Sequence, residues 1–168
     1  GAFFRHWIRL VLPGGRATIP QGQIFKHAGR LTTFSPGYRM IADIRRWYAD
    51  EPDWRKAFGL LSTHYGYDKY GGNCHMVPNH GLIILSLLYG EDDFQKTLMI
   101  VNTCGWDTDC NGATVGGLVG LAGRPIPGHW TAPWNDRVGV SLAGVSELAL
   151  DELVARTVAV ADGISTRR

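Results

Sequence analysis

The segment between Pro78 and Leu88 constrains the fold more than any other part of this sequence. Its apolar side chains would fall on nearly every side of a helix rather than on one face: Leu82, Ile83, Ile84, Leu85, Leu87 and Leu88. A helix that is apolar all round has to be surrounded by other elements. We therefore predict a buried central helix that ends at Gly90, with further helices packed around it.

The segments that precede this run have the apolar spacing of amphipathic helices. Pro36 suits the first position of a helix, and the apolar residues that follow it fall on one face: Met40, Ile41, Ile44, Trp47 and Tyr48. Asp53 can cap a second helix, which would continue to Gly66 with Trp54, Ala57, Phe58 and Leu61 facing inward. Residues 65–79 are predicted to form a loop, because they are rich in glycine and polar groups.

Three more helices are expected after the central one. The acidic residues 91–93 favour a helix start before Phe94, and another helix should follow the stretch 105–112 and run to about Gly123. Residues 127–144 are predicted to be irregular, with at most a short strand near 138–142. The last helix is expected from Ser146 to about Ala161, with four apolar side chains facing inward: Leu150, Leu153, Val154 and Val158.

The chain as a whole is therefore predicted to be all-α, a compact multi-helix domain with a buried central helix. Its 168 residues are enough for one domain with a real core, and we expect residues 1–168 to form a single domain. Residues 3–11 could form a further helix, which glycine and proline residues would end early.

Charge and cysteine content exclude several classes of function. A net charge of +2 with scattered basic residues does not suggest a nucleic-acid partner. No segment has the pattern of a signal peptide or the length of a membrane span, so no membrane partner is expected. The three cysteines, Cys74, Cys104 and Cys110, form no CxxC pair, which favours the reducing cytoplasm over a disulfide framework or a structural zinc site.

The stretch GWDTDCNG, at positions 105–112, carries the clearest sign of chemistry. Asp107, Asp109, Asn111 and Gly112 match positions 1, 3, 5 and 6 of an EF-hand calcium loop. Position 12 of that loop requires a bidentate glutamate, but Leu118 stands there and no nearby carboxylate replaces it. The EF-hand interpretation is therefore excluded.

Asp107 and Asp109 still favour a hard cation. Two carboxylates at this spacing do not share a face of a regular helix, but on the turn that enters a helix they can converge on one point. Such an oxygen site would suit Mg²⁺ or Mn²⁺. The alternative is that one of the two aspartates only caps the helix.

A row of glycines follows this stretch at a spacing of four: Gly112, Gly116 and Gly120. Each glycine inside a helix costs up to about 1 kcal/mol relative to alanine, so the row needs a structural reason. We expect it to let another helix approach closely and so hold the aspartate-bearing end in place.

Several motifs together resemble the C-terminal half of the ADP-ribosylglycohydrolase family. The main likeness lies in NTCGWDTDCNGATVGGLVGLAGRPIPGHW, which LLYGEDDF precedes. Supporting matches occur in order along the chain: IPQGQIF near the start, PDW at 52–54, VPN at 77–79 and HWTAPWNDRV at 129–138. The likeness covers roughly residues 17–160.

This resemblance implies an all-α fold and Mg²⁺ as cofactor, usually as two ions, with Mn²⁺ as a substitute. It implies hydrolysis of the glycosidic bond between ADP-ribose and an acceptor on a protein or a small molecule. Asp107 and Asp109 inherit metal-binding and catalytic roles. Cys110 occupies the next ligand position, where the family commonly has threonine, and could be a metal ligand or a small buried residue.

The family also has metal ligands in an N-terminal half, within Gly-Asp and Thr-Asp-Asp motifs that this sequence lacks. The chain is therefore expected to be the C-terminal portion of the fold, with the N-terminal half apparently absent and a missing segment as a possible partner. The alternative function is a non-catalytic helical fragment, or a divergent member without a complete bimetal centre.

Other residues are weaker candidates for the site. Asn79 could hydrogen-bond substrate or cap the central helix, and Trp106 could wall the substrate site or belong to the core. The loop tyrosines Tyr65, Tyr67 and Tyr70 could stack on adenine or simply pack. A zinc site from the nearby histidines and Cys74 is disfavoured by their spacing.

Overall fold

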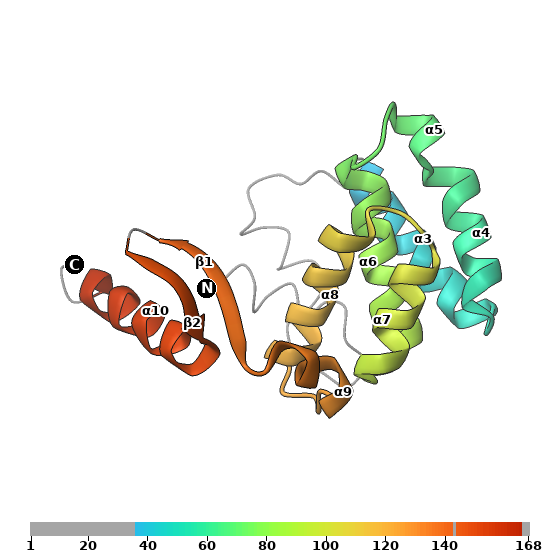
Figure 1. Cartoon of the computed structure of the whole chain (residues 1–168). Coiled ribbons are helices and arrows are strands. Elements are labelled where there is room, and N and C mark those ends of the chain that lie inside the picture. The colour runs from blue at the N-terminus through green and yellow to red at the C-terminus, as the bar shows by residue number, and fades with distance from the viewer. Residues whose placement is uncertain (1–35, 143, 166–168) are drawn as a thin grey trace. The chain divides into compact units, whose positions relative to one another are not determined.

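The computed structural model describes residues 36–142 and 144–165 (Figure 1). The chain divides into two compact units, Gly1–Pro125 and Ile126–Arg168, which are described here separately. The possible helix at residues 3–11 lies outside the described residues. The prediction of a single domain stays a prediction.

The first unit is a group of helices around a central one. Its elements are α3 (Pro36–Asp50), α4 (Trp54–Tyr65), α5 (Tyr67–Tyr70), α6 (Met76–Gly90), α7 (Phe94–Thr103) and α8 (Thr108–Leu121). Helix α6 contacts α3, α4, α5, α7 and α8. Figure 1 shows it among α3, α7 and α8. It buries side chains on all sides, among them Leu82, Ile84, Leu85, Leu87 and Leu88. The predicted buried central helix is confirmed, and so is the all-α class.

Local sequence signals set most of these helix boundaries. The Asp53 carboxylate accepts a hydrogen bond from the Arg55 N–H at 2.9 Å and caps α4. Asp93 caps α7 in the same way, accepting from the Lys96 N–H at 2.6 Å. The prediction that residues 65–79 form one loop is wrong, because α5 forms within them and α6 begins at Met76.

The closest helix approaches occur on α6 rather than along the predicted glycine row. A Cβ added at Gly90 would lie 1.9 Å from Thr97 Oγ1, and one at Gly81 would lie 2.8 Å from both Leu61 and Met40. On α8, a Cβ at Gly112 would lie 3.2 Å from Asn102 Oδ1, and one at Gly116 would make an ordinary contact with Leu98 at 3.8 Å. Gly112 and Gly116 therefore face α7, and of these two Gly112 has the tighter approach.

The second unit contains the described strands. It comprises α9 (Gly128–Thr131), the short 3₁₀ helix η1 (Ala132–Trp134), β1 (Arg137–Leu142), β2 (Val145–Ala149) and α10 (Leu150–Ser165). The two strands pair antiparallel, with Val138 opposite Leu148 and an irregularity between Gly139 and Leu142. The predicted short strand is confirmed as β1.

The prediction for the last helix is wrong at its start. Residues 145–149 pair with β1, so α10 begins only at Leu150, whose N–H donates to the Asp136 carbonyl at 2.8 Å. Leu150, Val154 and Val158 were expected to face inward, but they are exposed. Within the described residues, no helix combines the length and the apolar character that a membrane span requires.

Candidate functional site

The turn between α7 and α8 has an unusual backbone. Gly105 has φ of +74° and Asp107 has φ of +44°, so both lie in the left-handed region. Glycine tolerates this region freely, and aspartate is among the few other residues that enter it without a large penalty. The buried Asn111 stabilises the turn, because its Nδ2 donates to the Trp106 carbonyl at 2.7 Å. Asn111 is thus a structural residue of the site.

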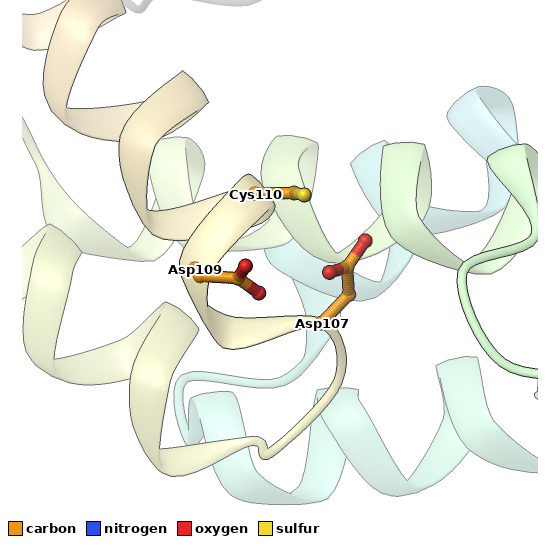
Figure 2. A group of neighbouring side chains, drawn as sticks. All are labelled: Asp107, Asp109 and Cys110. Carbon is orange, nitrogen blue, oxygen red and sulfur yellow. The ribbon is translucent and has the colours of Figure 1, made fainter. Parts of the chain in front are cut away.

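The turn brings three possible ligand groups together. One donor atom from each of Asp107, Asp109 and Cys110 lies within 4.8 Å of the others. Figure 2 shows the two carboxylates pointing toward one another, with the Cys110 sulfur beside Asp107. In the parts of the chain that the structure describes, this is the only group of three or more His, Cys, Asp or Glu side chains so placed.

The side chain of Asp107 does not cap α8, although the residue occupies the N-cap position. Its Oδ2 instead accepts a hydrogen bond of 2.6 Å from Nδ2 of Asn79, in the first turn of α6. The alternative that Asp107 serves only as a helix cap is therefore wrong. The alternative that Asn79 caps α6 is also wrong, because the His75 side chain fills that role by accepting from the Val77 N–H at 3.2 Å.

Tyr67 extends this arrangement from the short helix α5. Its hydroxyl donates to Oδ1 of Asn79, and burial raises the pKa of that hydroxyl. The ring of Tyr67 lies 4.9 Å from that of Trp106, measured between centroids, and Phe58 packs edge-on against Trp106 at 5.0 Å. The half-buried Trp106 is thus part of an aromatic group beside the turn, and its role in substrate binding stays a prediction.

Two thiols lie near the Asp107 carboxylate. The pKa of Cys110 is raised, first by a hydrogen bond with Asp107 and then by the charges of Asp107 and Asp109. The pKa of Cys74 is also raised, by desolvation and then by the charge of Asp107. Sequence reasoning considered Cys74 only for zinc, and nothing in its position along the chain indicates its proximity to Asp107.

The donor set fits a hard divalent cation through its oxygens. Carboxylate oxygens such as those of Asp107 and Asp109 are the ligands that Mg²⁺ prefers, and both side chains are at least partly accessible from solvent. A thiol such as that of Cys110 is a poor ligand for such an ion, because sulfur is a soft donor. Asp107 and Asp109 are therefore the residues suited to hold Mg²⁺, with Cys110 beside them.

The remaining aromatic and histidine candidates interact elsewhere. Tyr65 donates its hydroxyl to Asp43 at 2.6 Å, and the ring of His64 stacks on Trp47 at 5.8 Å. The Tyr70 ring lies 5.0 Å from that of His75. Of the three loop tyrosines, Tyr67 is the one that contacts the residues around Asp107.

Comparison with known protein families matches residues 5–162, nearly the whole chain, to ADP-ribosylglycohydrolase. No curated protein and no solved structure matches significantly. The match includes the turn with Asp107 and Asp109 and covers most of both compact units described above. The chain belongs to the ADP-ribosylglycohydrolase family.

Proposed function

We propose that the chain takes part in hydrolysing the glycosidic bond between ADP-ribose and an acceptor, with Mg²⁺ held by Asp107 and Asp109. One observation carries the proposal: the donor atoms of Asp107, Asp109 and Cys110 lie within 4.8 Å of one another at the start of α8. Family membership adds the class of reaction, because the family is hydrolytic.

The chemistry follows from the positions of the two carboxylates. When bound, Mg²⁺ would supply positive charge that polarises ribose hydroxyls and orients water near the anomeric carbon. Asp107 lies on the turn that Asn111 stabilises and is half-buried, whereas Asp109 is exposed in the first turn of α8. The ring of Trp106 lies next to this turn and is proposed to limit the approach of the substrate from one side.

The test measures release of ADP-ribose from peptides modified on arginine or serine and from a small ADP-ribosylated molecule. We expect release with Mg²⁺ or Mn²⁺, and loss of release with a chelator. Asp109→Ala should lower the rate by at least about 100-fold, because it removes one of two charged ligands. The Mg²⁺ dissociation constant, measured by calorimetry, should rise in the same variant.

The matched control is Asp50→Ala, which removes an exposed aspartate at the end of α3 and should leave the rate unchanged. Release that survives both the chelator and Asp109→Ala would overturn the metal mechanism. A chain that binds Mg²⁺ but releases nothing from any substrate would instead support the alternative of a divergent, non-catalytic family member.

A further inference from the structure

A chain of two hydrogen bonds connects α5, α6 and the turn before α8. Tyr67 donates to Asn79, and Asn79 donates to Asp107 at 2.6 Å. We propose that Tyr67 and Asn79 are positioning residues that fix the Asp107 carboxylate for cation binding. This inference rests on the proposed function, since it assigns Asp107 the role of a ligand.

The chemistry of the three groups gives the hydrogen bonds one direction. An ionised carboxylate can only accept, so the Asn79 amide must turn its Nδ2 toward Asp107. Its Oδ1 then faces Tyr67, and an amide oxygen can only accept, so the Tyr67 hydroxyl must donate. Each bond therefore determines the orientation of the next group.

Different contacts hold Tyr67 and Asp107, the two ends of this series of hydrogen bonds. The Tyr67 ring packs against Trp106, which Phe58 contacts from another direction at 5.0 Å. At the other end, the left-handed backbone of Asp107 points its side chain away from the usual capping geometry, and the carboxylate makes no capping hydrogen bond with α8. Asn79 thus supplies an orienting hydrogen bond from α6, in addition to the hydrogen bond that Asp107 makes with Cys110 in α8.

Groups that hydrogen-bond to a metal ligand commonly change metal affinity about 10- to 100-fold when they are removed. Asn79→Ala should weaken binding within that range, because it removes the direct donor to Asp107. Tyr67→Phe keeps the ring beside Trp106 and removes only the hydroxyl. Its effect should be smaller, about fivefold, since the lost bond is between neutral groups.

The experiment measures the dissociation constant of Mn²⁺ by calorimetry for the full chain and its variants. The matched control is Tyr65→Phe, which removes a tyrosine hydroxyl bonded to the Asp43 carboxylate, two residues away from Tyr67. A double variant, Asn79→Ala with Tyr67→Phe, tests the connection. If Tyr67 acts through Asn79, the double variant should bind Mn²⁺ as weakly as Asn79→Ala alone.

The outcomes separate this inference from the proposed function. Weaker Mn²⁺ binding in both Asn79→Ala and Tyr67→Phe supports the positioning role of Tyr67 and Asn79. In that case Tyr65→Phe should bind Mn²⁺ like the wild type, and the midpoints of urea unfolding should be unchanged. Unchanged dissociation constants in Asn79→Ala and Tyr67→Phe would overturn it while leaving the cation site intact. Fully additive losses in the double variant would overturn the role of Tyr67. A wild-type chain without Mn²⁺ or Mg²⁺ affinity would overturn both proposals, whereas metal binding without ADP-ribose release would overturn only the hydrolytic one.

Discussion

The two units bury apolar side chains to very different degrees. In residues 36–125, five helices contact α6, whose Leu82 and Leu85 are fully buried. In residues 126–165, Leu148 is the single hydrophobic side chain among the described ones that is buried. Helix α10 exposes a set of apolar residues instead: Leu150, Val154, Val158, Val160 and Ile164.

This difference explains where a rigid site can form. Burial of apolar surface is the main source of stability, and a densely packed core also fixes the backbone around it. The turn that contains Asp107 is tied to α6 through Asn79, so it is connected to the best-packed helix of the chain. We therefore expect substitutions in the first unit to cost more than the same substitutions in the second.

Replacing one leucine in each unit should give the largest contrast. Leu85→Ala would open a cavity beside α6 and should lower the free energy of unfolding by about 2–5 kcal/mol. Leu150→Ala truncates a side chain that is 40% exposed and should cost less than about 1 kcal/mol. Urea unfolding followed by circular dichroism measures both, and equal losses would contradict the contrast.

Two Gly→Ala variants, one in each unit, compare the units by the effect of adding one methyl group. Gly90→Ala would place a Cβ 1.9 Å from Thr97 Oγ1 and should cost about 1–3 kcal/mol, because α6 and α7 would have to separate. Gly163→Ala, in α10, meets nothing within 4 Å and should change stability by less than about 1 kcal/mol. Thermal unfolding of the two variants distinguishes them. A harmless Gly90→Ala would show that the two helices can move apart freely.

Alkaline pH should lower stability through the first unit. Burial, followed by the hydrogen bond to Asp43, raises the pKa of Tyr65 to about 12, and burial raises that of Tyr89 to about 12. Folding favours the neutral phenols, so this stabilisation is complete below the unfolded value of about 10 and is lost as pH rises toward 12.

The measurement is the free energy of unfolding as a function of pH. The double variant Tyr65→Phe with Tyr89→Phe should lose less stability than the wild type between about pH 10 and 12. Every tyrosine of the chain lies between positions 38 and 89, so residues 126–168 contribute no phenol to this loss. Identical pH profiles for the wild type and the double variant would rule out Tyr65 and Tyr89 as the source of the stability lost at alkaline pH.

The elements with strong local signals could be predicted from the sequence. The caps Asp53 and Asp93 and the apolar run of α6 are encoded by neighbouring residues, so they needed no tertiary information. Strand β2 could not be predicted, because Ser146 resembles a helix cap and the strand depends on pairing with β1. The short helix α5 could not be predicted either, because it lies within a segment rich in glycine.

The site, like the fold, could be predicted only where neighbouring residues determine it. The spacing of Asp107 and Asp109 before a helix indicated that the carboxylates could converge, and the structure brings them together. The contact between Asp107 and Asn79 joins residues 28 positions apart, so it depends on how α6 and α8 pack. Tyr67 and Cys74 lie near the site because of the course that the segment before α6 takes. Local sequence signals do not determine that course.

The left-handed backbone at Asp107 also limits which residues evolution can place there. Glycine or asparagine would suit the turn but remove the negative charge, whereas glutamate would keep the charge and strain the backbone. Aspartate is the residue that satisfies both requirements. Homologous chains that retain the proposed activity should therefore retain aspartate at this position, and a chain with asparagine should keep the fold while losing the cation.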